Sequence, residues 1–233
     1  MSINKYKHLL EARRNMKTVM KAVSVFFGIL LACILIFPIS AANCMAAQSI
    51  DQEWSKVETP QMPALEKVRI DPASTALLML DFNKQTCNAD RSPRCIATLS
   101  KVQKLLTEAR AKGVAVIYSL SGGADTADIA TEVAHVDGEP IVTSGPDKFL
   151  GTDLDVILKA KKITTVIVVG TSAHGAVLYS ASGAALRGLK VIVPVDGLSA
   201  EQLYPEQYTV WHLKNAPRVS AQVTLTKIDL IEY

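Results

Sequence analysis

The chain has 233 residues, a length that fits one domain or at most two. Apolar residues make up 49 % and charged residues 20 %, a composition that excludes a chain disordered throughout. The net charge of +3 is concentrated near the start: residues 1–47 carry +5, so residues 48–233 carry −2. This mildly acidic body excludes the basic surface that nucleic-acid binding requires.

Residues 1–47 have the order of an export signal. Basic residues end at Lys21, a mostly apolar run without a charge covers residues 22–37, and small residues follow Pro38. This succession is typical of a cleaved signal peptide, and the run is shorter than the roughly 20 residues that span a bilayer comfortably. We therefore expect an exported protein, either periplasmic or secreted. Two alternatives stay open: residues 22–37 remain as a membrane anchor, or Cys44 carries a lipid.

Export places the remaining cysteines in an oxidising compartment. Cys87 and Cys95 are eight positions apart, and the polar, turn-rich segment between them suits a closed loop. In such a compartment the two residues are expected to form a disulfide. The alternative is a reactive thiol at Cys87, which follows closely after Asp81.

The folded part of the chain is predicted to begin near residue 73. Residues 48–72 contain three prolines and no sustained hydrophobic period, which predicts a linker ahead of a domain at residues 73–233. The apolar run of residues 75–82 predicts a strand that is buried on both faces. Helical spacing over residues 96–112 and a second apolar run at residues 114–120 predict a helix followed by another strand.

The second half of the domain continues this alternation after a predicted loop with one helical turn at residues 121–139. Strands are predicted at residues 141–144, 163–170, 190–197 and 223–231, and helices at residues 153–161, 175–186 and 201–214. The last strand alternates apolar and polar residues, which predicts a sheet edge. Within the last helix, the aromatic-containing residues 203–213 are expected to cover the core or to form an interface between copies of the chain.

Strands with two apolar faces, alternating with helices, predict the fold class. The fold is expected to be α/β, with a doubly wound, mostly parallel sheet and helices on both of its faces. Ligands of such sheets bind beyond the carboxyl ends of the strands. This rule selects Asp81, the loop after Gly170, and Asp196 as candidate site positions.

Three features near that edge could carry chemistry, and each alone has an ordinary structural explanation. Asp81 ends an apolar strand, where an acid either reacts or caps the next element. Lys148 lies between a short strand and a helix, where a lysine is usually solvated. The small residues after Gly170 open a helix, which either lets backbone N–H groups approach an anionic group or allows close packing on the sheet.

In combination and in this order, the three features resemble the isochorismatase-like family, often called cysteine hydrolases. TALLMLDFNKQTC is similar to that family's first strand with its catalytic aspartate, and DKFLGTDLDVIL to the segment with its catalytic lysine. VIVVGTSAHGAVLYSASGAALRG is similar to its strand, nucleophile turn and helix. The resemblance covers about residues 70–200 and implies a Rossmann-like three-layer fold and a homo-oligomer.

For the amidase members, the resemblance implies Asp81 as a general base toward a cysteine, Lys148 as an electrostatic partner, and turn amides as the oxyanion site. The nucleophile position falls on Ala176, which has no thiol, and this excludes thioester chemistry there. The residues implied to bind substrate or the oxyanion are Phe82, Asn83, Ser172, Ala173, His174 and Gly175. No histidine pair matches the family's metal cluster, since His135 and His174 stand alone, so neither a metal nor a cofactor is expected.

Another branch of the family, the isochorismatases proper, needs no thiol. Residues 173–176, Ala-His-Gly-Ala, are similar to the Ala-His turn of that branch, with Ala176 at a glycine position. This resemblance implies Asp81 as a general acid that protonates a vinyl-ether carbon before water adds, with Lys148 orienting or neutralising a carboxylate. Burial would favour a protonated Asp81, whereas a close Lys148 would oppose it.

Three functions therefore stay open. The first is a family hydrolase that cleaves a C–N or ether bond of a small molecule without a cysteine nucleophile, using Asp81 as general acid or base and Lys148 as electrostatic partner. The second is a non-catalytic family member that binds a small ligand. The third is a cysteine amidase whose nucleophile has been replaced by alanine. Each has a small-molecule partner, no nucleic acid, and membrane contact only through the N-terminal segment.

Overall fold

The computed structural model describes Met16, residues 49–121 and residues 123–233. The predicted export signal therefore lies, apart from Met16, outside the described residues. The chain divides into two units, Met1–Glu58 and Thr59–Tyr233. In the first unit the description covers a short helix, α2 (Ile50–Glu53), and one 3-10 turn, η1 (Trp54–Lys56). Within the described part of the chain, no helix combines the length and apolar character needed to cross a membrane.

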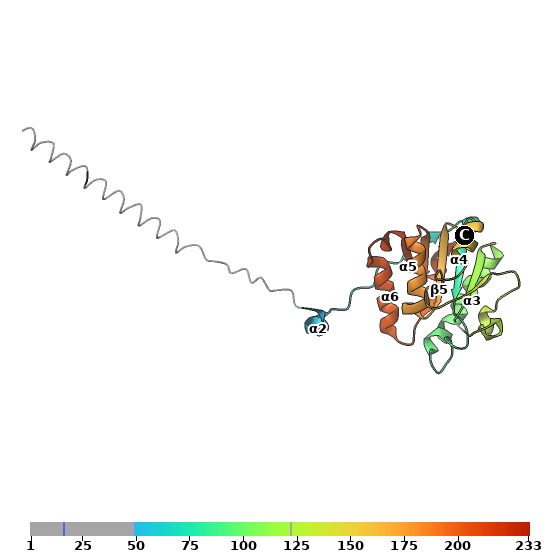
Figure 1. Ribbon diagram of the computed structural model, residues 1–233, viewed down its shortest axis with the longest axis horizontal. Helices are drawn as coiled ribbons and strands as arrows, with labels where there is room; N and C mark the ends of the chain where they lie inside the picture. The colour runs from blue at the N-terminus through green and yellow to red at the C-terminus, as the bar shows by residue number, and fades with distance from the viewer. Residues whose placement is uncertain (1–15, 17–48, 122) are drawn as a thin grey trace, which may run out of the picture. The chain divides into compact units, whose positions relative to one another are not determined.

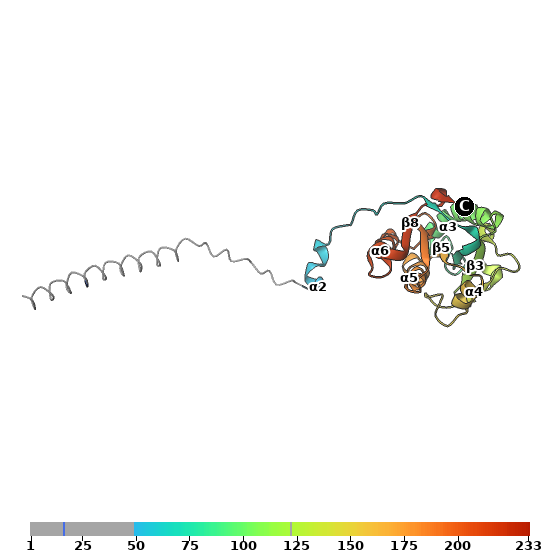
Figure 2. The same ribbon diagram turned by 90° about the horizontal axis from the view of Figure 1, so that it is seen from above.

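The second unit is built around a seven-stranded sheet (Figures 1 and 2). Its strands are β2 (Thr75–Leu80), β3 (Ala115–Leu120), β4 (Ile141–Thr143), β5 (Thr165–Thr171), β6 (Lys190–Pro194), β7 (Leu198–Ser199) and β8 (Val223–Thr226). Their order is β4-β3-β2-β5-β6-β8, β7 pairs with the end of β5, and every pairing is parallel. The predicted doubly wound parallel sheet is confirmed.

Alternate residues of a strand point to opposite sides of the sheet, and in these strands both sets are apolar. Both faces of the sheet are therefore covered by helices. Leu78 and Leu80 of β2 belong to a core that also contains residues of α4 (Leu154–Ala160), α5 (Leu178–Leu186) and α6 (Leu203–Asn215). Leu77 and Met79 belong to the opposite core, with residues of α3 (Pro93–Ala111). Figure 2 shows α3 on one side of the sheet and α4 and α5 on the other.

The prediction of a single final strand at residues 223–231 is wrong. The chain leaves the sheet after β8, makes a 3-10 turn, η7 (Ile228–Leu230), and ends in β9 (Ile231–Glu232). β9 pairs with β1 (Val68–Arg69), a short strand within the predicted linker. Val223 and Leu225 pack in one core whereas Ile228 and Ile231 pack in the other. The alternating apolar residues therefore belong to a segment that passes from one face of the sheet to the other. The sequence pattern of such a segment is the same as that of a single strand.

The structure also differs from the predicted elements in short segments without a clear hydrophobic period. The loop at residues 121–139 contains two 3-10 turns, η3 (Thr126–Asp128) and η4 (Thr131–Val133), where one helical turn was expected. The helix expected at residues 175–186 starts within a π-helix, η5 (Ala173–Val177), and its α-helical part, α5, begins only at Leu178. Two further 3-10 turns lead into strands: η6 (Ser220–Gln222) into β8 and η2 (Pro72–Ser74) into β2.

Gly170 brings β2 and β5 unusually close at the edge where the site lies. It pairs with Leu80, and its φ of +152° is a conformation that side chains rarely adopt. A Cβ at this position would lie 2.4 Å from the Leu80 carbonyl oxygen. Because that oxygen belongs to the backbone, no side-chain rotation could remove the clash. Only glycine allows the two strand ends to approach in this way.

A disulfide joins Cys87 and Cys95, the pairing expected from their spacing. Both residues are buried, Cys95 lies in the first turns of α3, and their Cα atoms are 5.3 Å apart. The bridge closes the loop that leads from the carboxyl end of β2 to α3. It therefore connects the strand end that carries Asp81 to the helix that covers one face of the sheet.

We predict that removing this bridge lowers the free energy of unfolding by about 2–3 kcal/mol, because the unfolded chain gains the entropy of an open loop. The measurement is urea unfolding of the Cys87→Ser/Cys95→Ser variant beside the unmodified chain, each with and without reductant. Reductant should shift the midpoint of the unmodified chain only. Equal midpoints in all four samples would show that the bridge contributes nothing.

Candidate active site

Asp81 follows directly after β2 and is held in a left-handed conformation with φ of +54°. Such a conformation is uncommon for a residue other than glycine and is retained where neighbouring contacts determine it. The Asp81 N–H donates to the carbonyl of Ser119 at 3.2 Å, and the Thr86 hydroxyl donates to the Asp81 carbonyl. The Ser119 hydroxyl donates to Oδ1 of Asp81 at 2.7 Å, so the carboxyl group has a fixed orientation.

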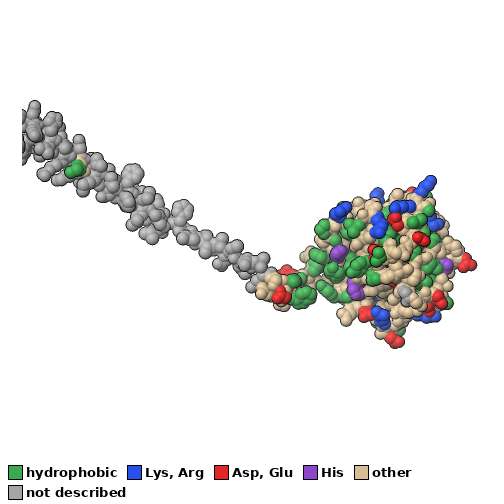
Figure 3. Space-filling model, viewed as in Figure 1, with side chains coloured by type: hydrophobic (Ala, Val, Ile, Leu, Met, Phe, Trp, Pro, Cys, Tyr) green, Lys and Arg blue, Asp and Glu red, His purple; other side chains and the backbone are tan. Residues whose placement is uncertain are grey.

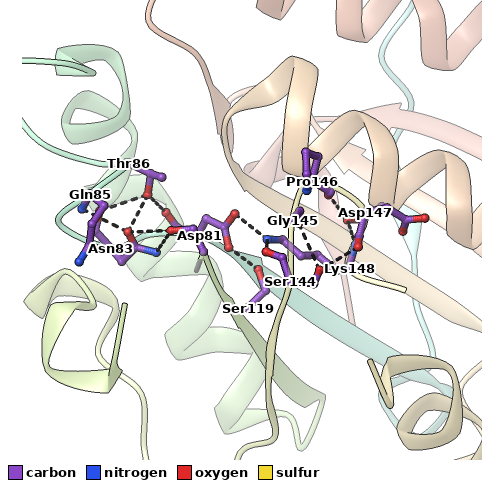
Figure 4. A network of polar contacts seen from close by, with 12 residues as sticks. Asp81, Asn83, Gln85, Thr86, Ser119, Ser144, Gly145, Pro146, Asp147 and Lys148 are labelled. Carbon is purple, nitrogen blue, oxygen red and sulfur yellow. Dashed lines mark hydrogen bonds and ion pairs between the residues drawn. The ribbon is translucent and has the colours of Figure 1, made fainter. Parts of the chain in front are cut away.

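Lys148 occupies the interior rather than the solvated position usual for a lysine. Its side chain is 0 % exposed, and its Nζ donates to Oδ2 of Asp81 at 2.7 Å and to the Ser144 carbonyl at 3.2 Å. Figure 4 shows this ammonium group pointing from the segment before α4 toward the Asp81 carboxylate. The Asp81 side chain is 8 % exposed, so the two residues form a nearly buried ion pair.

The segment that carries Lys148 is fixed by helix α5. The backbone N–H of Lys148 donates to Oγ of Ser180 at 3.2 Å, and the Ser180 hydroxyl contacts the Pro146 carbonyl. The Ser144 hydroxyl donates to the Asp147 carbonyl at 2.8 Å, which closes the turn before the lysine. The position of the ammonium group thus depends on a helix that follows it in the chain by some thirty residues.

The turn after β5 is the third part of the predicted site. The peptide bond between Thr171 and Ser172 is cis, and the π-helix η5 begins at Ala173. Ala173 and Ala176 are buried, whereas His174 is exposed and its Nδ1 lies 2.8 Å from Oγ of Ser172.

Sheet register places these parts at one edge. Leu80 pairs with Ser119 of β3 and with Gly170 of β5, so the residues after all three strand ends leave the sheet at the same level. Asp81, Ser119 and the turn after Gly170 therefore share the carboxyl edge, where parallel sheets bind ligands. The approach of Lys148 to Asp81 completes the arrangement that strand-end reasoning predicts.

Other predicted positions have contacts that bind them into the fold. Phe82 is buried in the core on the α3 side. Asn83 is also buried: its Nδ2 donates to Ser121, and its Oδ1 accepts from Thr86. Asp196 follows β6 at the carboxyl edge, but its carboxylate has other partners: Oδ1 accepts from the N–H of Ile228 and Oδ2 contacts Lys101.

His135 also makes contacts that fix it within the fold and lies in a different loop from the candidate site. Its Nε2 lies 2.8 Å from the Glu139 carbonyl, and its ring meets the edge of Tyr118. The Tyr118 hydroxyl donates to the Val133 carbonyl, and burial raises the pKa of this phenol. Among residues 49–121 and 123–233, no three His, Cys, Asp or Glu side chains converge in a group that could hold a metal ion.

Sequence reasoning did not identify the three serines that position the ion pair. Ser119 is the last but one residue of β3, the strand beside β2, and its place near that strand end is the signal that the sequence offers. Ser144 and Ser180 act through a backbone carbonyl and a backbone N–H, contacts that leave no pattern in a single sequence.

We predict that Lys148→Met lowers the free energy of unfolding by about 3–5 kcal/mol, because it leaves the Asp81 carboxylate buried without its partner. The measurement is urea unfolding at neutral pH. Asp81→Asn/Lys148→Met should lose less than the two single variants together, since neither residue then leaves an unpaired charge.

A matched control removes the ammonium group of an exposed pair. Lys104 contacts Asp229 at the surface, so Lys104→Met should leave the midpoint of unfolding unchanged. An equally small effect of Lys148→Met would mean that the pair in the interior is not formed in solution.

Comparison with known proteins yields one family and a set of related folds. The model of a protein family described as isochorismatase domain matches residues 75–227. The N-carbamoylsarcosine amidase of Arthrobacter sp. is 26 % identical over 145 residues, which are 50 % of this chain and 55 % of that protein. The chain thus spans about half the length of the curated relative that it matches.

Solved structures share the fold over nearly their whole length. A cysteine hydrolase from Pseudomonas syringae pv. phaseolicola has a TM-score of 0.62 at 21 % identity, covering 72 % of this chain and 95 % of its own. N-carbamoylsarcosine amidase from Thermoplasma acidophilum has a TM-score of 0.57 at 23 % identity, covering 67 % and 97 %. An isochorismatase family protein from Desulfovibrio vulgaris has a TM-score of 0.61 at 18 % identity, covering 67 % and 95 %.

Proposed function

The chain belongs to the isochorismatase family of hydrolases, and from this premise we propose that it hydrolyses a small molecule at the Asp81–Lys148 pair without a cysteine thiol. The observation that carries the proposal is the nearly buried ion pair at the carboxyl edge of the sheet. Burying two charges is costly, and a fold keeps such a pair where it serves a purpose beyond packing. Its place at the edge where parallel sheets bind ligands supports a catalytic purpose.

The contacts of Asp81 favour the role of a base over that of an acid. A carboxylate paired with an ammonium group at 2.7 Å is ionised, and an ionised carboxylate accepts a proton but has none to donate. Asp81 therefore takes a proton from the attacking water as its oxygen adds to the substrate. The same proton passes to the leaving amine or alcohol when the bond breaks, which returns Asp81 to its ionised state.

Ala176 supports water as the attacking group. By the family resemblance it stands at the nucleophile position, and a methyl group cannot form the covalent intermediate that a thiol would form. Its side chain is small and buried. The positive charge of Lys148 stabilises the negative charge that develops as water is deprotonated.

N-carbamoyl amino acids are the first substrates that we propose to examine, since the curated relative is an N-carbamoylsarcosine amidase. Other small amides and esters complete the set for a base. Vinyl ethers are added as a test of the opposite role, because the thiol-free branch of the family implies Asp81 as an acid, and their hydrolysis would contradict the role of a base. A substrate with a free carboxylate has a further reason to be included, as Lys148 offers a charge to orient it.

We predict that Asp81→Asn lowers kcat about 10²–10⁴-fold toward whichever substrate the unmodified chain hydrolyses, because the base is lost while the shape of the residue is kept. Lys104→Met, which changes only an exposed charge, should retain full activity. Iodoacetamide should leave the unmodified chain active, because no thiol takes part. Full turnover by Asp81→Asn, or inactivation by iodoacetamide, would contradict the proposal.

A second candidate function is ligand binding without turnover. Its support is the low exposure of the pair, with side chains 0 % and 8 % exposed, together with an alanine at the nucleophile position. This candidate gains support if calorimetry detects a bound member of the set that the chain does not hydrolyse. Hydrolysis that appears only in Ala176→Cys would instead favour a cysteine amidase that has lost its nucleophile.

Export is also part of the proposal, because two features support it independently. Residues 1–47 have the order of a signal peptide, and a disulfide between Cys87 and Cys95 is stable in an oxidising compartment. Fractionation of expressing cells, followed by N-terminal sequencing, is the measurement. Chain found only in the cytosol, with its first residues intact, would contradict export.

A further inference from the structure

A cavity of about 580 Å³ opens at the amino edge of the sheet, at the other end of the strands from Asp81. The starts of β5, β6 and β8 form one wall, and residues 66–71, which include β1, form the other. Cavities that bind small molecules usually have volumes of roughly 300–1,000 Å³. Its size therefore suits a small molecule, and we call it the amino-edge cavity.

Hydrogen bonds hold residues 66–71 in place as a fixed wall of this cavity. The N–H of Glu66 donates to the Leu225 carbonyl of β8 at 2.9 Å, and the N–H of Ile70 donates to the Glu232 carbonyl at 2.8 Å. Between these two bonds β1 pairs with β9, so the segment is attached both to the sheet and to the end of the chain. The cavity is thus formed in the free protein, which is usual for ligand sites.

The two acidic residues that line the cavity already have partners. Oδ1 of Asp71 accepts from the N–H of Ala73 at 3.1 Å, and Oδ2 accepts from the Ser74 hydroxyl at 2.7 Å. Glu66 contacts the ammonium group of Lys214 at 3.4 Å, which neutralises its charge. Both carboxylates are therefore occupied by groups of the chain itself.

The basic residues give the cavity a positive charge that the chain does not neutralise. Lys67 and Arg69 contact the same carboxylate, that of Glu232, and Asp71 offsets the surplus positive charge. Lys190 is exposed, and in the described part of the chain no carboxylate lies within ion-pair distance of its ammonium group. In Figure 3 Lys and Arg side chains gather at the end of the domain where Figure 1 marks the C-terminus, the end that holds β1 and β9. One net positive charge thus borders the cavity, and it suits a ligand with one negative charge.

Uncharged polar side chains line the same cavity with their hydrogen-bonding groups free. Within residues 49–121 and 123–233, four of the lining side chains make no hydrogen bond: Thr164, Thr165, Gln222 and Thr224. A threonine hydroxyl both donates and accepts a hydrogen bond, and a glutamine amide has two donor hydrogens and an acceptor oxygen. Hydroxyl groups of a ligand, which also donate and accept, are the matching partners.

We propose that the amino-edge cavity binds a small carboxylate that carries several hydroxyl groups, such as a sugar acid. Lys190 binds the carboxylate, and the threonine and glutamine side chains bind the hydroxyl groups. A phosphate ester carries about −1.5 to −2 charge at neutral pH, more than the one net positive charge can match. The site is separate from the candidate active site, because β5 runs from Thr165 in the cavity to Thr171 at the other edge, a span of roughly 20 Å. The inference is therefore independent of hydrolysis.

The test is isothermal titration calorimetry of the full chain, purified in a mild detergent, with three six-carbon probes. Gluconate carries the carboxylate and the hydroxyl groups, sorbitol carries hydroxyl groups without the charge, and hexanoate carries the carboxylate without hydroxyl groups. Gluconate should bind about 10-fold more tightly than either of the other probes, because it alone satisfies both the charge and the polar side chains. An equal affinity for sorbitol or for hexanoate would overturn the proposal, as would no detectable binding of gluconate at millimolar concentration.

Two variants locate the bound gluconate. Lys190→Met should weaken the binding of gluconate about 10-fold and leave that of sorbitol unchanged, because it removes only the charge. Thr164→Val keeps the shape of an exposed side chain and should weaken the binding of both probes roughly 5-fold, since the lost hydroxyl serves both. It also replaces Lys190→Met if that variant fails to fold.

The matched control is Lys112→Met, because Lys112 is an exposed lysine that follows α3 and does not line the cavity. It should bind gluconate as tightly as the unmodified chain, and thermal melting should show which variants are folded. Gluconate binding that Lys190→Met and Thr164→Val both leave unchanged would place the ligand elsewhere, for example at Lys148, and would overturn the proposal.

Discussion

The buried contact between Asp81 and Lys148 is the interaction on which the rest of the structure depends. Removing two charges from water costs several kcal/mol per ion, so each requires its partner and further hydrogen bonds. Asp81 obtains these from Ser119, and Lys148 from the Ser144 carbonyl. The pair thereby links the end of β2, the neighbouring strand and the segment before α4. An error in the placement of any one would leave a charge unpaired in the interior.

Much of this arrangement could be predicted from the sequence, because it follows from rules that act locally. Apolar runs that alternate with helical spacing require a parallel sheet, and a parallel sheet brings its strand ends to one edge. Asp81 and the turn after Gly170 were placed by that reasoning alone, and the register of β2 with β5 agrees. Lys148 was harder to place, since no local rule states that a lysine before a helix turns inward.

What could not be predicted depends on contacts between distant parts of the chain. Ser180 lies 32 positions after Lys148 and binds its backbone N–H, which no spacing rule links to the site. The final segment is a second such case, because alternation of apolar residues does not indicate which of the two cores a residue enters. Ile228 and Ile231 pack on the face opposite to Val223, a fact that depends on the turn between them.

Helix α5 combines these constraints in nine residues. Its inward side must lie close to the sheet and to the segment before α4, so it is composed of small residues such as Ala181 and Ala184, with Ser180 beside Lys148. Its first turn continues from η5 and therefore fixes Ala176. Close packing on the inner side of a helix does not prevent charged residues on its outer side, and α3 carries such residues. Tyr179 and Leu186 stand there instead, both more than half exposed, so the outer side of α5 is apolar where that of α3 is charged.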